Sequence, residues 1–433
     1  MTEHEYEIPG LFFKEHYFEC PLDHNQPSSS MITIFAREVV SLSKKNEKLP
    51  FILFLQGGPG FPSPRPLLNE GWMKRALKEF RILYLDQRGT GKSSPITYQS
   101  MSLFNSPHEQ AEHLKNFRSD SIVSDCEMIR KELIGDEKWS VLGQSFGGFC
   151  ITRYLSAAPE GLREVFLTGG LPITEGGVDR VYRHTYPRVL IRNKAYYERY
   201  PEDVLRIKEI AQYLLENDVQ LPGGGRLTAR RFQQYGMGFG FVGGFENLHY
   251  MVLEAFVVTS NGKELSYPFL RTFENSQAFE TNPLFAIMHE SIYCHQFASN
   301  WAAERVHNTL PEFEIKPEEQ DFYFVGEMVF PWMFDDYKYL RPLKEAAEIL
   351  AQYDDWPCLY DFDQLAKNEV PVAAAIYYED MLVERKFSEE TAAKIQGISL
   401  WVTNEYDHGG LRHDGEKILD RLIGLARKEI ASH

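Results

Sequence analysis

The chain contains a serine in a sequence setting that favours its use as a nucleophile: Gly-Gln-Ser-Phe-Gly at residues 143–147. An apolar run at 139–142 precedes it and a helix-compatible segment begins near Phe146, so we predict a strand, a sharp turn carrying Ser145 and a helix. Such a turn strains the serine backbone, and a side chain two positions to either side would clash, which explains the two glycines. The five-residue pattern alone is weak evidence, so its value depends on its partners.

A base and a carboxylate should follow the serine in the chain, with the histidine last. Asp380 follows an apolar run at 371–378, at the carboxyl end of a predicted strand, where sites of open α/β sheets lie. His408 follows the next run, 398–402, and precedes two glycines. We expect His408 to take the proton from Ser145, and Asp380 to orient the imidazole and stabilise its positive charge.

Other residues compete for these two roles. Glu379, Asp361 and Asp363 are alternative acids near the same predicted strand. His413 is the alternative base, although it falls inside or at the start of the last predicted helix. The chain has 13 histidines, and most histidines serve on the surface or as caps, so spacing alone leaves the alternatives open.

The sequence Gln-Gly-Gly-Pro-Gly at residues 56–60 follows a predicted buried strand. Unhindered backbone N–H groups at such a place can bind the negative charge that develops on a carbonyl oxygen during acyl transfer. We expect Gly58 to provide one donor and Phe146, the residue after the nucleophile, the other. Without the serine motif these glycines would indicate only a tight turn.

Apolar patterns predict the elements that must position these residues. Residues 51–55 and 82–85 are continuous apolar runs, typical of strands buried on both faces of a parallel sheet. Residues 31–36 and 165–167 predict further strands, and residues 414–429 a closing helix. One helical stripe is formed by Ile122, Cys126, Ile129 and Leu133. The alternation of strands and helices predicts an α/β fold with a mostly parallel, doubly wound sheet.

The pattern changes between residues 172 and 357. Long amphipathic stretches rich in Tyr, Phe, Arg and Glu replace the buried-strand runs, and the glycines at 223–225 suggest a hinge or loop. We therefore predict a mostly helical insertion that divides the chain into residues 1–171, 172–357 and 358–433. Because the insertion separates Ser145 from Asp380, we expect it to cover the site as a lid.

Composition excludes several classes of protein. The net charge of −16 disfavours nucleic acid and anionic membrane as partners. Five scattered cysteines without C-x-x-C indicate neither a disulfide framework nor a thiolate metal site, and no H-E-x-x-H is present. No signal peptide is visible and no apolar run approaches the ~20 residues that cross a bilayer. We expect a cytoplasmic protein without metal or cofactor, and an oligomer is compatible with the sequence.

Residues 86–93, Asp-Gln-Arg-Gly-Thr-Gly-Lys-Ser, end like a nucleotide-binding loop. The first glycine that such a loop requires is replaced by Asp86, so we reject nucleotide binding. We expect a structural role instead, in which Asp86 and Arg88 pair and brace the loop beside the oxyanion donors.

Together these segments resemble the prolyl aminopeptidases, or proline iminopeptidases, of the α/β-hydrolase superfamily. The resemblance covers nearly the whole chain and rests on residues 57–60, 86–93, 143–148 and the helix around Asp125 and 129–130. Chain length and the late segments 378–380 and 405–409 are similar to the larger subtype. Smaller members usually carry His where this chain has Gln56, which leaves the backbone donors intact.

The resemblance implies an α/β-hydrolase core with a large helical cap, and release of N-terminal proline from peptides by a serine peptidase through an acyl-enzyme. It also implies that cap glutamates hold the free amino group of the substrate, since a buried cation needs carboxylate partners. Glu290, in residues 288–293, resembles one such glutamate, and Glu254 and Glu246 are candidates for the second. Glu327 is a further possibility that we do not choose. An esterase, an amidase or an aminopeptidase of broader specificity is the alternative on the same fold, and a non-catalytic binding protein the third hypothesis.

Overall fold

The computed structural model describes residues 4–26, 28–260 and 262–430. Its centre is a nine-stranded sheet with strand order β1-β2-β3-β5-β4-β6-β7-β12-β13. β1, β2 and β3 form an antiparallel meander that joins β5, and the remaining strands are parallel. The strands are β1 His4–Ile8, β2 Leu11–Pro21, β3 Met31–Ser41, β4 Phe51–Leu55, β5 Arg81–Leu85, β6 Trp139–Gln144, β7 Leu162–Thr168, β12 Val372–Tyr377 and β13 Ile398–Thr403. The predicted mostly parallel sheet is confirmed.

Helices cover both faces of the sheet, as the continuous apolar runs predict. Leu53 and Leu55 of β4 pack on the side of α4 and α5, whereas Ile52 and Phe54 pack on the side of α1 and α18. A strand with both faces buried in this way must be apolar throughout. The core helices are α1 Gly71–Ala76, α2 Tyr98–Met101, α3 Pro107–Leu114, α4 Ser119–Ile134, α5 Phe146–Ala157, α15 Phe362–Leu365, α16 Arg385–Ala392, α17 Gly410–His413 and α18 Gly415–Ala426.

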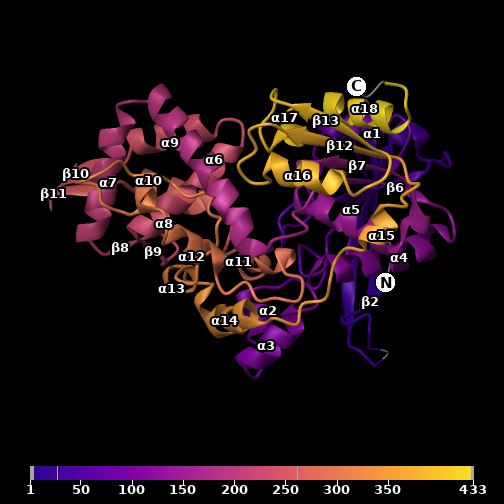
Figure 1. Ribbon diagram of the computed structural model, residues 1–433, viewed down its shortest axis with the longest axis horizontal. Coiled ribbons are helices and arrows are strands. Elements are labelled where there is room, and N and C mark those ends of the chain that lie inside the picture. The colour runs from indigo at the N-terminus through magenta and orange to yellow at the C-terminus, as the bar shows by residue number, and fades with distance from the viewer. Residues whose placement is uncertain (1–3, 27, 261, 431–433) are drawn as a thin grey trace.

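The insertion between β7 and β12 forms a second lobe beside the sheet (Figure 1). It is mostly helical, as predicted, but it also contains two short hairpins, β8–β9 and β10–β11, that the sequence pattern does not reveal. We propose residues 172–357 as the cap. Its elements are α6 Gly177–Arg199, α7 Asp203–Glu216, β8 Val219–Gln220, β9 Arg226–Leu227, α8 Ala229–Gln233, α9 Gly244–Leu253, β10 Phe256–Thr259, β11 Gly262–Leu265, α10 Tyr267–Ser276, α11 Pro283–Met288, α12 Ala302–His307, α13 Met333–Asp336 and α14 Lys344–Gln352.

A buried arginine of the core fastens one side of the cap. The guanidinium of Arg118, at the start of α4, donates to the carbonyl oxygens of Cys294 (2.9 Å) and Pro357 (2.8 Å). It also stacks on the ring of Trp356, and α14 packs against α3 nearby (Figure 1). These charge-assisted bonds are buried, so they hold this edge of the cap firmly on the core.

The expected pair between Asp86 and Arg88 is wrong, because the turn after β5 directs the two side chains to different sides. Asp86 accepts two hydrogen bonds from Arg65 (2.7 and 2.6 Å). Arg88 is buried and donates to both carboxylate oxygens of Asp125 in α4 (2.7 and 2.6 Å). The segment therefore braces two loops through two separate ion pairs.

None of the helices in the described ranges has the length and apolar character needed to span a membrane.

Candidate active site

Ser145 lies at the sharp turn between β6 and α5, with φ 54° and ψ −125°. The positive φ is one that a non-glycine residue rarely adopts, so the strained turn is confirmed. A Cβ on Gly143 would lie 2.5 Å from the carbonyl oxygen of Gly147, and one on Gly147 would lie 2.0 Å from that of Leu55. Both glycines are therefore needed for the turn to form against β4.

The loop after β4 runs beside this turn, because β4 and β6 are neighbours in the sheet. A Cβ on Gly57 would lie 3.0 Å from the Cβ of Ser145. Phe146 is the first residue of α5, where backbone N–H groups have no partner within the helix. The N–H of Gly58 makes no hydrogen bond within the described ranges. Two unpaired donors thus lie near the serine, as the oxyanion prediction requires.

The cap presses directly on this loop. A Cβ on Gly60, which has φ 84°, would lie 2.7 Å from both the Cβ of Leu284 and the backbone nitrogen of Phe285 in α11. Only glycine permits this close approach together with this backbone conformation. The loop is held from the other side by Gln87, whose side-chain amide donates to the carbonyl oxygen of Gln56 (3.0 Å).

Asp380 and His408 lie together on the loops that follow β12 and β13. Nδ1 of His408 donates to Oδ2 of Asp380 over 2.7 Å, while Oδ1 accepts from the backbone N–H groups of Leu382 (2.9 Å) and Val383 (3.1 Å). Both side chains are buried. This bond fixes the imidazole so that Nε2 is free for another partner.

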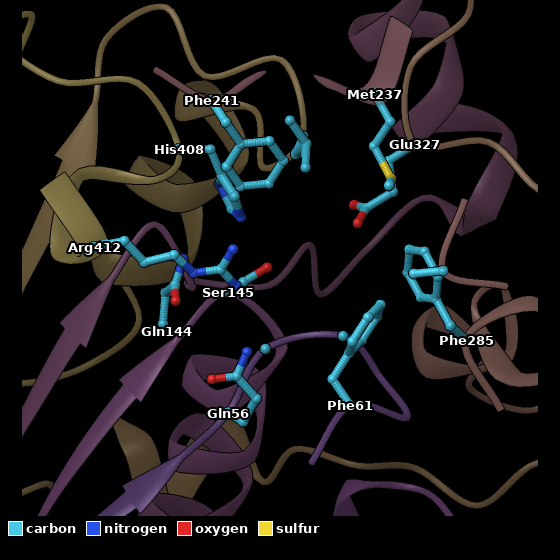
Figure 2. Close-up of a pocket in the computed structure, with 14 residues that line it drawn as sticks. Gln56, Phe61, Gln144, Ser145, Met237, Phe241, Phe285, Glu327, His408 and Arg412 are labelled. Carbon is cyan, nitrogen blue, oxygen red and sulfur yellow. The ribbon is translucent and has the colours of Figure 1, made fainter. Parts of the chain in front are cut away.

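The imidazole of His408 lies over the hydroxyl of Ser145, and both side chains line one pocket (Figure 2). Burial alone would lower the pKa of His408, but the charge of Asp380 and its hydrogen bond outweigh burial and raise it. The pair thus favours the protonated imidazole that would form when His408 accepts the serine proton.

The competing acids and the competing histidine lie elsewhere. Glu379 pairs with Arg188 (3.1 Å) on the surface, Asp361 accepts from the N–H of Gln364 at the start of α15, and Asp363 is exposed. His413 is exposed at the end of α17. The three-dimensional arrangement therefore favours Asp380 and His408 over these alternatives.

The pocket at Ser145 has a volume of about 170 Å³ and is closed on one side by the cap. Its lining includes three aromatic side chains, and on one side of it the ring of Phe61 meets that of Phe285 edge to face, with the ring centroids 5.1 Å apart (Figure 2). Its lining residues are Gln56, Gly57, Gly58, Phe61, Gln144, Ser145, Met237, Phe241, Ala278, Phe285, Glu327, Leu382, His408 and Arg412. The insertion thus covers the site, as expected of a lid.

Glu327 is the only carboxylate among these lining residues. Figure 2 shows its carboxylate directed into the pocket, across from Ser145 and His408. Within the described part of the chain it forms no ion pair or side-chain hydrogen bond, and burial raises its pKa to about 7, against the opposing effect of the His408 charge. An unpaired carboxylate in an apolar pocket is a suitable partner for a cation.

Buried polar contacts hold the loop that carries Glu327. The amide of Asn193, inside α6, donates to the carbonyl oxygen of Phe324 (2.9 Å) and accepts from its N–H (2.8 Å). The N–H of Val325 donates to the carbonyl oxygen of Gln233 (2.9 Å). The carboxylate is therefore presented from a fixed backbone.

Comparisons with known proteins agree with this geometry. The chain is 49% identical to a proline iminopeptidase of Aeromonas sobria over 423 residues, covering 98% of each chain. It is 38% identical to a proline iminopeptidase of Aspergillus aculeatus over 420 residues, covering 95% of this chain and 93% of the other.

The chain belongs to the proline iminopeptidase family.

A shorter match supports the same family. A proline iminopeptidase of Neisseria meningitidis is 31% identical over 143 residues, which are 30% of this chain and 39% of that protein. A family described as the alpha/beta hydrolase fold matches residues 50–236. The family match covers the strands β4 to β7 of this chain and the turn that carries Ser145.

The structure does not bring Glu290 to the pocket, which corrects the first choice for amine binding. Its carboxylate accepts the backbone N–H groups of Ala302 (3.1 Å) and Ala303 (2.8 Å) at the start of α12. Burial raises the pKa of Glu290, and these N–H groups partly offset that effect. The carboxylate already has its hydrogen bonds as the cap of α12, and the sequence around Glu290 does not indicate that α12 is its partner.

Glu246 and Glu254 also lie away from the pocket. Glu246, in the first turn of α9, pairs with Arg199 (2.7 Å) and accepts from the hydroxyl of Tyr200 (3.3 Å). Glu254 is exposed at the end of α9. Both follow the ordinary pattern of glutamates on a solvent-facing helix, so of the four glutamates considered from the sequence only Glu327 lines the pocket. Glu327 had a signal in the sequence: it is a single carboxylate within the otherwise apolar run 322–330.

Glu290→Gln is expected to lower the free energy of unfolding by ~1–3 kcal/mol, because the new amide can accept only one of the two N–H groups. Thermal unfolding measures this, with exposed Glu254→Gln as the control that should not change. kcat/KM for prolyl substrates should stay within about threefold of wild type. A large, selective loss on substrates with a free amino group would instead return Glu290 to the amine site.

The side chains around Ser145 are not arranged as ligands of a metal ion within the described ranges. Across the described ranges, no group of three or more His, Cys, Asp or Glu side chains is placed to hold a metal ion. The pocket contributes one carboxylate and one imidazole, and the imidazole is already bonded to Asp380. These side chains suit proton transfer and cation binding.

Proposed function

We propose that this protein is a serine exopeptidase that releases N-terminal proline from peptides through an acyl-enzyme. The observation that carries the proposal is the unpaired carboxylate of Glu327 in an apolar pocket that also contains Ser145 and His408. The full-length relatives named proline iminopeptidase support the same activity.

In the proposed reaction, Nε2 of His408 takes the proton of Ser145 while the serine oxygen attacks the carbonyl carbon of proline. The N–H groups of Gly58 and Phe146 stabilise the resulting oxyanion, and Asp380 stabilises the imidazolium. His408 then gives the proton to the departing amine of the peptide. Water attacks the prolyl ester by the same proton transfers in reverse and frees proline.

The pocket suits a single small residue. Its volume of about 170 Å³ is below the ~300–1,000 Å³ typical of pockets for drug-sized ligands. The proline ring would contact Phe61, Phe241 and Phe285, and its carbonyl would face Ser145. The ring nitrogen, a cationic secondary amine when it ends the chain, would bind Glu327.

This arrangement also explains cleavage at the chain end. A residue before proline would convert the amine into a neutral amide and would have to pass through the wall of the cap. Glu327 would then lack its cation, and a buried charge without a partner is costly. The geometry therefore selects free N-terminal proline over internal proline.

Prolyl-2-naphthylamide and N-acetyl-prolyl-2-naphthylamide test the proposal on the wild-type protein. We expect kcat/KM to be higher for the free amine by at least ~100-fold, the size of a lost buried ion pair. Equal rates would contradict an exopeptidase and favour the esterase or amidase alternative. Alanyl-2-naphthylamide, cleaved as fast as the prolyl compound, would point to an aminopeptidase of broader specificity.

The pH dependence of ester hydrolysis should report the coupling between Glu327 and His408. The charge of Glu327 helps to raise the pKa of His408, and His408 must be neutral to accept the serine proton. Glu327→Gln removes that charge, so the pKa of His408 falls. With p-nitrophenyl acetate, which has no amine, the acid limb of kcat/KM should therefore move to lower pH. Glu254→Gln should leave the limb in place; an unmoved limb in Glu327→Gln would contradict the coupling.

We also propose a cytoplasmic location. All five cysteines are free, and Cys20, Cys126, Cys150 and Cys294 are buried. Unpaired thiols in a chain of this length are typical of a reducing compartment.

A further inference from the structure

Arg412 is a cation at the active site that the proposed reaction does not use. It follows His408 by four residues, in α17, and Figure 2 shows its guanidinium directed into the pocket beside Ser145. Within the described ranges the guanidinium makes no ion pair or hydrogen bond; it lies over the ring of Phe241, with its carbon 5.6 Å from the ring centroid. An arginine without an anionic partner beside a nucleophile is free to bind a substrate group.

A second cavity of about 420 Å³ adjoins the catalytic pocket at this arginine. The two cavities share Gln56, Gln144 and Arg412. The outer cavity lies against the loop 64–68 and helix α1, and its rim is strongly apolar: Leu67 is 80% exposed and Leu68 is 64% exposed. The three residues that the two cavities share lie on the side of the catalytic pocket away from Glu327 (Figure 2).

The other charged groups of the outer cavity are Arg65 and Glu70. The guanidinium of Arg65 is paired through two hydrogen bonds with the buried carboxylate of Asp86. Glu70 is exposed and does not line the catalytic pocket. At the junction of the two cavities, the charge available to a ligand is therefore that of Arg412.

We propose that Arg412 binds the C-terminal carboxylate of a dipeptide substrate, and that the outer cavity receives the side chain of the residue after proline. This inference rests on the proposed function and adds a substrate class to it: proline-containing dipeptides with an apolar second residue. Arg412 is then a specificity-determining residue on the leaving-group side of the scissile bond.

Distance and chemistry both favour a carboxylate one residue beyond the scissile bond. An extended residue spans ~3.3–3.6 Å, so a guanidinium that lines the same pocket as Ser145 is within reach of a carboxylate at the next residue. The planar guanidinium matches a carboxylate through two parallel hydrogen bonds. In a longer peptide the same position holds a neutral amide, which gains much less from the charge.

Prolyl-leucine and prolyl-leucinamide, which differ only in this carboxylate, test the proposal. For the wild-type protein, kcat/KM should be higher for the free acid by about tenfold or more, the typical gain from a charge-assisted bond. Arg412→Met should bring this ratio close to one, and Arg412→Lys should restore part of it. Higher ionic strength should weaken the wild-type preference, because the site is open to solvent.

Arg421→Met is the matched control, since Arg421 is also an exposed arginine stacked on an aromatic ring, that of Trp401 (4.7 Å). It should keep the wild-type ratio and the wild-type rates. A wild-type ratio of one, or an Arg412→Met variant that slows both substrates equally, would overturn the proposal. Prolyl-2-naphthylamide carries no carboxylate, so its hydrolysis reports on the proposed function separately from this ratio.

Discussion

Ser145→Ala is expected to lower kcat/KM for prolyl-2-naphthylamide by ~10⁶-fold, as when the nucleophile of a catalytic triad is removed. Without the serine oxygen no acyl-enzyme forms, and His408 and the backbone donors have no attacking group to assist. The hydroxyl faces the pocket and not the packed core, so its loss should leave the fold in place. Steady-state kinetics and thermal unfolding, measured on the same preparation, check both parts.

Surface Ser102→Ala serves as the matched control and should keep wild-type kinetics. Activity near the wild-type level in Ser145→Ala would rule out Ser145 as the nucleophile, because no other hydroxyl or thiol side chain lines the pocket within the described part of the chain. A parallel loss of activity and of folding would instead show that the strained turn needs the serine itself, which the unfolding curve would reveal.

Glu327→Gln is expected to lower kcat/KM for substrates with free N-terminal proline by ~10²–10³-fold, which corresponds to the 3–5 kcal/mol lost when a buried charge is left without its partner. Glutamine has nearly the same shape, so the pocket keeps its volume and loses only the charge. The cationic ring nitrogen of the substrate would then enter an apolar pocket that contains no anion. Rates with the free and N-acetylated prolyl substrates, measured side by side, isolate this effect.

The decisive quantity is the ratio between those two substrates. In Glu327→Gln the preference for the free amine should collapse, whereas in Glu254→Gln it should remain. If the variant lost activity equally on both substrates, Glu327 would have a structural role in the loop, and the proposed recognition of the amino group would need another residue.

The core could be predicted from the sequence, and the residues proposed for catalysis could be placed in it, because each of them is tied to the end of a strand. The glycines around Ser145 are required by contacts with β4 and within the turn itself, so their spacing is visible locally. Asp380 and His408 follow apolar runs that are buried on both faces, and parallel strands bring their carboxyl ends to one edge of the sheet. The apolar runs and the residues that follow them were therefore enough to predict that Ser145, Asp380 and His408 lie at one edge of the sheet.

The polar contacts of the cap could not be predicted in the same way, because its polar side chains bond to segments that are distant in the sequence. Glu290 is bonded to the backbone of α12, and Arg88 to Asp125 of α4 rather than to its near neighbour Asp86. Neither partner is marked by spacing. Glu327 differs from them by having no partner within the described residues, and only the pocket shows that its carboxylate is free.

The contact between Gly60 and α11 couples the position of the cap, which controls entry of the peptide, to the position of the Gly58 N–H. The loop that positions Gly58 leans on the backbone of the cap at Leu284 and Phe285. Any outward swing of that helix would take support away from the donor at the same moment that it widened the passage. The enzyme would then be unable to hydrolyse a peptide bond while the cap is open. The oxyanion donor would be fully positioned only once the peptide is enclosed.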